Sequence, residues 1–281
     1  MHKMKKKFGY KETLFDLILS KFIDLIQFFL LLKNNSKFSN QFKQQLNLKS
    51  YLLFEEKKIF FKTGHNRLNW RVKSFYKEEP LMIDWLKEFN NKDIFLDIGA
   101  NVGTYTIPAI SKGAFAYAVE LDLINSSVLF ENLYLNNFLK KCLILPFGVG
   151  KKNSIENIFY RDFSVGDSFQ SVTNEQKIPT ILKNKFSSKQ IIFSLDSIFE
   201  IFNLKKPNKI KIDVDGNEMI VFEGGKKIIK NAKEIYLENN GTKNDKKIFN
   251  FLLKNGFKIY EQLKAKNSVE SVNTINFLFK K

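Results

Sequence analysis

The fold of this chain is decided by one stretch, Ile94-Phe95-Leu96-Asp97-Ile98-Gly99-Ala100-Asn101-Val102-Gly103-Thr104. A short apolar run leads into an acid, then into a turn with two glycines, and then into a segment of helical character. In open α/β sheets, ligands bind outside the carboxyl ends of the strands. The stretch therefore predicts a buried strand over 94–98 and a ligand site around the turn that follows it.

Two acids accompany this turn at a spacing that indicates a nucleoside-containing cofactor. Asp97 lies two residues before the first glycine, and Glu120 ends the next apolar segment, 116–119. An ionised carboxylate only accepts hydrogen bonds, so Glu120 suits the two hydroxyls of a ribose. Asp97 suits an ammonium group such as that of a methionine moiety. The dinucleotide fingerprint needs three glycines in G-x-G-x-x-G, and position 101 is asparagine. The pattern favours S-adenosylmethionine (SAM), and hence a methyltransferase over a dehydrogenase.

The residues predicted to bind this cofactor surround the turn. Glycines let the backbone approach a ligand closely. A helix that begins near the end of the turn offers free N–H groups to the carboxylate of SAM. The predicted cofactor-binding residues are Asp97, Gly99, Asn101, Gly103, Thr104 and Glu120.

Strand-like and helix-like segments alternate from Asn90 onward, which predicts a mostly parallel sheet covered by helices on both faces. The last two strands are joined without a helix, which predicts an antiparallel pair at one edge. Residues 150–190 are polar and predict a long connection over the sheet edge. The strand candidates are 94–98, 116–120, 143–147, 210–214, 234–238, 257–261 and 275–279, and the helical patterns cover 104–111, 124–136, 217–229 and 245–255.

The expected fold class is therefore α/β, a Rossmann-like, seven-stranded, mostly parallel sheet of the class I SAM methyltransferase type. We expect the methyltransferase domain to span residues 86–281. Residues 1–85 form an N-terminal extension, in which short strands are expected over 51–76 and a helix from Pro80 to Phe89.

Candidate catalytic groups follow from the predicted strand ends. Asp213 faces the reactive end of the cofactor as a base or acceptor-orienting group, and Glu238 is a second carboxylate at the next strand end. His65 is a third candidate, because histidine titrates near neutral pH. Asp215 and Glu218 could complete a divalent metal site with Asp213. Acids beside a glycine more often serve as turn or cap residues, so no metal is predicted.

Composition limits the partners and the compartment. The formal net charge is +17, which arises either from a polyanion partner or from a general lysine bias. Nucleic-acid readers rely on arginine, and this chain has few, so no nucleic-acid partner is expected. The one cysteine, Cys142, allows no disulfide within the chain and no cysteine zinc site. We expect a cytoplasmic protein.

The N-terminal segment reads as a basic, amphipathic helix. Lysines cluster over 3–7, and the apolar stretch 14–32 is interrupted by polar residues at helical spacing. This pattern is too polar for a membrane span. The apolar side of the helix can pack on the main domain, form a homodimer seam, or lie on the inner membrane beneath the lysines.

Several motifs together resemble the FkbM-type methyltransferases over residues 90–281. That family usually has glutamate at position 215 and alanine at 217, where this chain has Asp215 and Asn217. The resemblance rests on 96–106, Glu120, Glu131-Asn132, Leu135-Asn136, 194–197, Ile210-Lys211-Ile212-Asp213-Val214-Asp215-Gly216-Asn217-Glu218, Glu223-Gly224-Gly225 and 276–279.

The resemblance implies SAM-dependent O-methylation of a hydroxyl in a sugar of a glycan, a glycolipid or a related metabolite. Two alternatives stay open: an RNA methyltransferase that uses the basic surface, and a catalytically silent binding module of the same fold. An RNA base methyltransferase is expected to carry an Asn/Asp-Pro-Pro-Tyr/Phe loop or a reactive cysteine. The corresponding strand end here reads Asp213-Val214-Asp215-Gly216.

Overall fold

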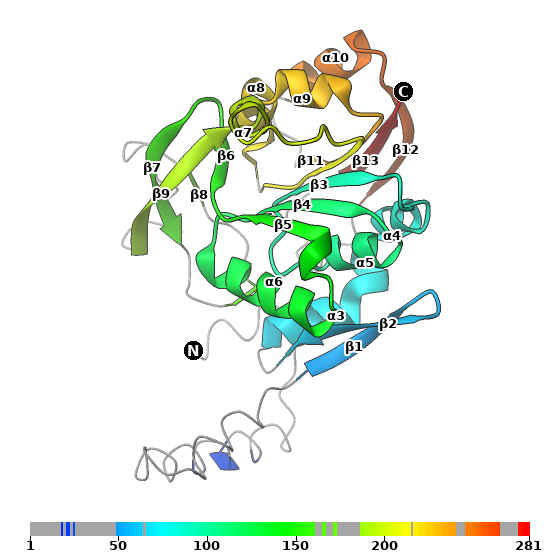
Figure 1. The fold of residues 1–281 in the computed structure, drawn as a ribbon, viewed down its shortest axis with the longest axis vertical. Helices are drawn as coiled ribbons and strands as arrows, with labels where there is room; N and C mark the ends of the chain where they lie inside the picture. The colour runs from blue at the N-terminus through cyan, green and yellow to red at the C-terminus, as the bar shows by residue number, and fades with distance from the viewer. Residues whose placement is uncertain are drawn as a thin grey trace.

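The structure is a computed structural model that describes residues 18, 21–22, 25, 49–63, 66–160, 165–166, 171–172, 186–214, 216–239, 245–264 and 275–281. Seven strands form its main sheet in the order β12-β13-β11-β10-β3-β4-β5 (Figure 1). The strands are β3 (Ile94–Ile98), β4 (Phe115–Val119), β5 (Cys142–Leu145), β10 (Lys209–Ile212), β11 (Glu234–Asn239), β12 (Lys258–Lys264) and β13 (Ile275–Lys280).

The chain enters this sheet at its centre and reverses direction there. From β3 it proceeds outward through β4 and β5, and it then returns to β10 on the other side of β3. The neighbouring strands from β11 through β10, β3 and β4 to β5 all pair in parallel. β13 is antiparallel to both β11 and β12, which confirms the predicted antiparallel edge. The reversal between β3 and β10 is the place where open α/β sheets bind ligands.

Helices cover both faces of the sheet, as predicted (Figure 1). On one face lie α4 (Pro80–Lys87), α5 (Thr106–Ser111) and α6 (Leu123–Leu135), around a core that includes Trp85 and Leu129. A second core, with Phe222 and Ile228, packs under the opposite helices. These are α7 (Leu195–Ile201), α8 (Glu218–Gly224), α9 (Lys226–Asn231) and α10 (Asp245–Lys254).

Residues 49–78 build a hairpin and a helix on the first face. The hairpin of β1 (Lys49–Phe54) and β2 (Lys57–Lys62) matches the predicted short strands. The expectation of strands up to residue 76 was wrong beyond the hairpin, because 66–78 is helix α3 (Asn66–Glu78). Leu68 and Phe75 recur at helical spacing and are buried, so tertiary packing selects the helix. The hairpin and Phe75 belong to the same core as α4 and α5, and the domain boundary at residue 85 stays a prediction.

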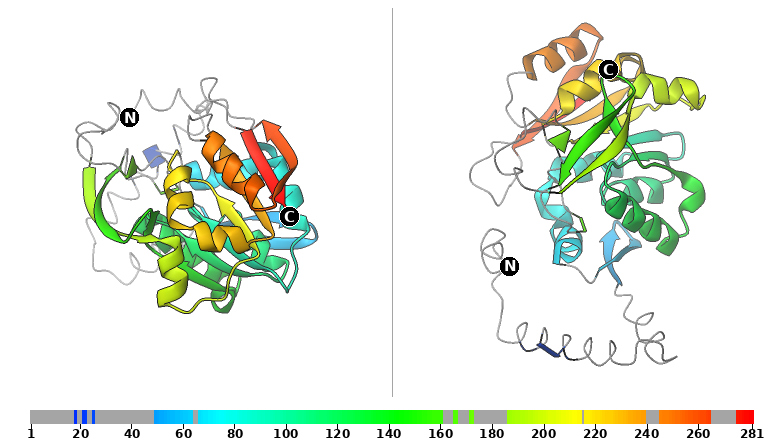
Figure 2. Two further views of the ribbon diagram at one scale, coloured as in Figure 1. Left: turned by 90° about the horizontal axis from the view of Figure 1, so that it is seen from above. Right: turned by 90° about the vertical axis from the view of Figure 1, so that its left-hand side faces the viewer.

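The connection after β5 is more ordered than its polar composition predicts. It contains β6 (Gly148–Gly150), β7 (Ser154–Tyr160), β8 (Ser171–Val172) and β9 (Phe186–Ser194), which form a small sheet in the order β6-β9-β7-β8. Its buried residues, such as Ile158 and Ile192, make a separate small core. This sheet stands beside the carboxyl end of the main sheet (Figures 1 and 2).

Two helix boundaries differ from the prediction. The helix after the glycine turn begins at Thr106 and not at Thr104, because residues 101–105 form turns. The predicted helix 217–229 is divided at Gly225 into α8 and α9. A side chain on Gly224 would lie 2.0 Å from the Gly150 carbonyl oxygen, so glycine permits this close approach of α8 to β6.

Of the predicted amphipathic helix 14–32, the structure describes only four residues, and these are helical. Ile18, Phe22 and Leu25 are exposed. The other residues that carry the predicted packing, dimer and membrane contacts lie outside the described residues. In the part of the chain that is described, no helix is both long enough and apolar enough to cross a membrane.

Candidate functional site

The glycine turn brings the ends of three strands together. Gly99 follows β3 with φ +83°, and its N–H and that of Ala100 donate to the Val119 carbonyl oxygen of β4 at 3.0 Å. A Cβ atom on Gly99 would lie 1.9 Å from the Asp213 carbonyl oxygen. Both the left-handed backbone and the close approach require glycine at this position.

Asn101 and Glu120, both predicted to bind cofactor, are in contact. The Asn101 N–H donates to Glu120 Oε2 at 2.7 Å, and Glu120 Oε1 accepts from the Asp122 N–H at 2.8 Å. Asn101 has φ +51°, a conformation that asparagine tolerates, and its own Oδ1 accepts from the Val102 N–H. Burial raises the pKa of Glu120 to about 7, although both backbone hydrogen bonds favour the ionised form. Each carboxylate oxygen keeps a second lone pair for a ligand hydroxyl.

Asp97 is buried at the end of β3 with one carboxylate oxygen unused. Its Oδ2 accepts from the Thr106 hydroxyl at 2.6 Å, whereas its buried Oδ1 has no hydrogen-bond partner among the described residues. The nearest cation is the Lys211 ammonium, 3.8 Å from Oδ1. Burial raises the pKa of Asp97, and Lys211 opposes that rise. An unused buried acceptor of this kind fits a cationic ligand group.

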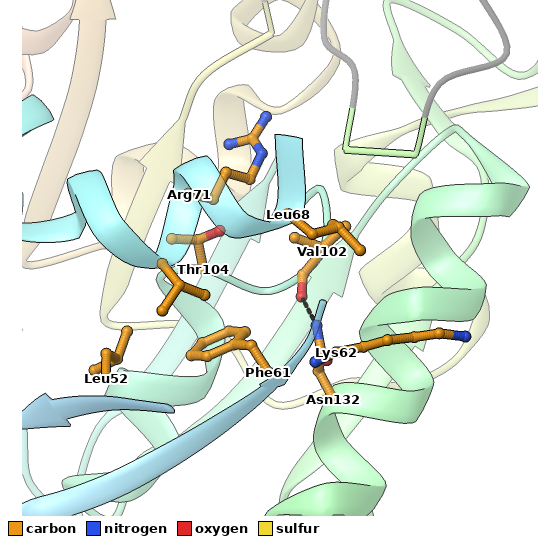
Figure 3. Close-up of a pocket in the computed structure, with 9 residues that line it drawn as sticks. Leu52, Phe61, Lys62, Leu68, Arg71, Val102, Thr104 and Asn132 are labelled. Atoms are coloured by element: carbon orange, nitrogen blue, oxygen red, sulfur yellow. Dashed lines mark hydrogen bonds between the residues drawn. The ribbon is translucent and has the colours of Figure 1, made fainter. Parts of the chain in front are cut away.

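The end of the turn places Gly103 and Thr104 beside a small cavity (Figure 3). Gly103 has φ +85°, and a Cβ atom there would lie 2.5 Å from Leu129 Cδ1. The Thr104 hydroxyl is buried and has no hydrogen-bond partner within the described structure. The cavity is lined by Leu52, Phe61, Lys62, Leu68, Arg71, Val72, Val102, Thr104 and Asn132.

The two predicted catalytic carboxylates also lie together. Asp213 follows β10, and its side chain makes a hydrogen bond with Glu238 of the neighbouring strand β11. The Asp213 side chain is 25% exposed, so a ligand can contact it. Burial alone would raise its pKa, but the Lys211 ammonium, 2.7 Å from Oδ2, and the Glu238 hydrogen bond outweigh burial and hold the pKa below its usual value. Asp213 is therefore ionised at neutral pH.

Sequence reasoning missed Lys211, which links the cofactor side of the site to Asp213. Its side chain is 1% exposed and lies between Asp97 and Asp213. Burial opposes its charge, but the surrounding carboxylates raise the pKa of the Lys211 ammonium, so it stays charged. The signal was present as a lysine within an apolar strand, because a buried lysine requires anionic partners.

Glu79 was missed as well, and its sequence position resembles a helix cap. It precedes Pro80, yet its side chain makes no capping hydrogen bond. Instead, it accepts from the hydroxyls of Tyr105 at 2.8 Å and Tyr236 at 3.0 Å. Burial raises the pKa of Glu79, and Lys211 opposes the rise. No local signal identifies Glu79, since its partners come from distant parts of the chain.

Two candidates are not placed. His65 and Asp215 lie outside the described residues. Glu218, at the start of α8, accepts from the Gly216 N–H at 2.9 Å, which is a turn-stabilising contact. In the described ranges, no three His, Cys, Asp or Glu side chains gather as metal ligands.

Comparison with known proteins identifies a family for this chain. Residues 97–259 match the family model described as the methyltransferase FkbM domain. The chain is 24% identical over 170 residues to the hexuronic acid methyltransferase AglP of Haloferax volcanii. That match covers 60% of this chain and 65% of AglP, so the chain spans less than two thirds of this curated relative.

Solved structures with weaker similarity include methyltransferase FkbM from Methylobacillus flagellatus, at 15% identity and a TM-score of 0.47, covering 69% of this chain and 44% of that one. Another is TrmK of M. capricolum in complex with S-adenosyl-homocysteine, at 11% identity and a TM-score of 0.42, covering 72% of this chain and 67% of that one.

The strand order, the glycine turn and the acids at the strand ends define a class I SAM-dependent methyltransferase fold. Within that class, the chain belongs to the FkbM methyltransferase family. SAM is the cofactor of this class, and the residues present fit it. Asp97 has an unused acceptor for the ammonium, Glu120 has lone pairs for the ribose, and Thr104 has an unused hydroxyl.

Proposed function

We propose that this protein transfers the methyl group of SAM to a hydroxyl oxygen, in a sugar of a glycan, a glycolipid or a related metabolite. One observation supports this most strongly. Asp213, an ionised and partly exposed carboxylate, is held by Lys211 beside Asp97 of the glycine-turn motif. A base next to the cofactor end of the sheet is the arrangement that methylation of a hydroxyl needs.

When bound, SAM would supply an electrophilic methyl group on a sulfonium for transfer to the acceptor oxygen, with the electrons of the carbon–sulfur bond passing to sulfur. Asp97 and Glu120 hold the cofactor at its ammonium and its ribose. Asp213 accepts the hydroxyl proton, and Glu238 orients Asp213 through their hydrogen bond. Correct alignment supplies about 7–11 kcal/mol in ideal cases. A general base adds about 10²- to 10⁴-fold in rate.

The sugar as acceptor is supported by the name of one relative and by the groups around Asp213. AglP is named as a hexuronic acid methyltransferase. Asp213 is an ionised carboxylate at this edge of the sheet, and the carboxyl group of Glu238 lies beside it. Carboxylates accept hydrogen bonds, so they suit an acceptor that presents several hydroxyl donors.

The first experiment measures binding and transfer separately. Calorimetry with S-adenosyl-homocysteine should detect binding by the wild type and by Asp213→Asn, and a strong loss in Asp97→Ala and Glu120→Ala. Labelled SAM is then supplied with a panel of mono- and oligosaccharides that includes uronic acids. Asp213→Asn should lower transfer about 10²- to 10⁴-fold while it leaves cofactor binding within about threefold.

Three outcomes would overturn the proposal. If the wild type does not bind the cofactor, the proposed methyl transfer from SAM is ruled out. Binding without transfer to any acceptor class would favour the silent module. Transfer to RNA, with RNA binding that weakens steeply as salt rises, would favour the nucleic-acid alternative.

A further inference from the structure

Arg71 of α3 reaches the glycine turn from outside the segment predicted as the methyltransferase domain. Its Nε and Nη2 donate to the Gly166 carbonyl oxygen at 3.2 and 2.9 Å. The Gly166 N–H in turn donates to Asn125 Oδ1 of α6 at 2.8 Å. These bonds fix the plane of the guanidinium, and its Nη1 has no acceptor among the described residues.

The charge of Arg71 acts at both ends of the site. Burial raises the pKa of Glu120, and the Arg71 guanidinium opposes this rise. Arg71 also opposes the effect of burial on the pKa of Asp213. The guanidinium is therefore within electrostatic reach of the acid expected to hold the ribose and of the acid expected to face the methyl group.

Arg71 also shares a cavity wall with the turn (Figure 3). It lines the small cavity together with Val102 and Thr104. Thr104 is 7% exposed, and its hydroxyl has no partner in the described part of the chain. A threonine hydroxyl can donate one hydrogen bond, and a guanidinium edge can donate two. The two side chains thus offer unused donors close to the turn.

The charges around the turn indicate what these donors bind. Carboxylates surround it, and the cations that act on them include Lys211 and Arg71. Lys211 is buried against Asp213 and Asp97, so it is already paired. The methionine part of SAM ends in a carboxylate, which needs a cationic partner in this acidic surrounding. The planar fork of arginine matches a carboxylate in geometry.

We propose that Arg71, assisted by Thr104, binds the methionine carboxylate of SAM. This inference rests on the proposed function, because it assumes that the glycine-turn site holds SAM. It assigns a cofactor contact to helix α3, which lies in the segment 1–85 and outside the predicted methyltransferase domain. Arg71 could bind a carboxylate on an acceptor sugar in the same way, and the experiment separates that ligand from SAM.

The test pairs a side-chain change with a ligand change, in the absence of any acceptor. We compare S-adenosyl-homocysteine with 5′-methylthioadenosine, which keeps the nucleoside and the thioether but lacks the carboxylate and the ammonium. Arg71→Gln should weaken S-adenosyl-homocysteine binding about 10- to 100-fold, the range for a hydrogen bond to a charged group. At about pH 8.5, where Glu120 stays ionised with or without Arg71, binding of 5′-methylthioadenosine should change less than about twofold.

Two variants complete the design. Lys73→Met removes one positive charge from the exposed side of the same helix and should leave both affinities unchanged. Arg71→Lys keeps the charge without the planar fork, and its loss for S-adenosyl-homocysteine should lie between those of the wild type and Arg71→Gln.

The inference is overturned if Arg71→Gln leaves both affinities unchanged, or if it weakens both ligands equally, since the residue would then only support the fold of the site. If Arg71→Gln leaves the S-adenosyl-homocysteine affinity unchanged but raises the KM for a carboxylated acceptor, Arg71 binds the acceptor and not the cofactor. That result would also overturn the inference. These failures leave the proposed function standing. If the wild type binds neither ligand, both proposals fall together.

Discussion

Replacing Lys211 by methionine tests the electrostatic centre of the site. Methionine has a similar length but no charge, so the change leaves Asp97 and Asp213 without their shared cation. The Lys211 and Asp97 side chains are each 1% exposed, and the Lys211–Asp213 distance is 2.7 Å. Removing one partner of a buried ion pair costs about 3–5 kcal/mol. We expect Lys211→Met to lower the free energy of unfolding by this amount near neutral pH.

The loss should depend on pH in a definite direction. Burial raises the pKa of Asp97 and Lys211 opposes this, so removal of Lys211 raises the pKa further. The pKa of Asp213, now held low against burial, rises for the same reason. An acid whose pKa is higher in the folded state than its unfolded value of about 3.9 destabilises the fold as pH rises above about 3.9, because the unfolded state then releases the proton more readily. The stability difference between variant and wild type should therefore be small near about pH 4.5 and grow toward about pH 7.5.

Urea unfolding followed by circular dichroism at these two pH values measures the difference. Lys87→Met is the matched control, because Lys87 pairs with Asp84 at 2.6 Å on the surface, where the two side chains are 46% and 66% exposed. That variant should lose less than about 1 kcal/mol at either pH. The reasoning is refuted if Lys211→Met costs less than about 1 kcal/mol at neutral pH, or if its cost is the same at both pH values.

Three further variants or conditions test the turn. Asp97→Asn should weaken S-adenosyl-homocysteine binding at least about tenfold by calorimetry, because the unused Oδ1 is the expected ammonium acceptor; an unchanged affinity contradicts that role. Gly99→Ala should lower the free energy of unfolding by about 2–4 kcal/mol, because the new Cβ would lie 1.9 Å from the Asp213 carbonyl oxygen and the backbone has φ +83°. Urea unfolding like that of the wild type would show that alanine is tolerated at this position. The wild type should bind S-adenosyl-homocysteine more tightly as pH rises through about 7, where Glu120 ionises, whereas Glu120→Gln should show a flat profile; parallel profiles count against Glu120 as the ribose acceptor.

Much of the site could be predicted because its residues follow strands. A buried strand with an acid and a glycine turn at its end is a local pattern, and parallel strands place their carboxyl ends at one edge. Asp97, Glu120 and Asp213 were each predicted at a strand end, and the structure brings them to one edge of the sheet with Glu238 beside Asp213. Roles in catalysis and cofactor binding for these residues stay predictions.

The second sheet and helix α3 show where local pattern fails. Residues 154–160 and 186–194 look polar, but each strand buries one face in a small core of its own. Segment 66–78 carries apolar residues compatible with either structure, and contact of Phe75 with the hairpin core selects the helix. In both cases the deciding partner is distant in sequence, so short-range periodicity does not contain it.

By itself, the sequence determined the class of fold and predicted the place of the cofactor, because both depend on the order of apolar strands and on glycines that neighbouring residues make necessary. Only the tertiary structure decided how charges are paired at that place. Lys211 lies between two carboxylates, Glu79 lies under two tyrosine hydroxyls, and Arg71 reaches the turn from α3. These pairings join residues from separate elements, and burial makes each of them energetically decisive.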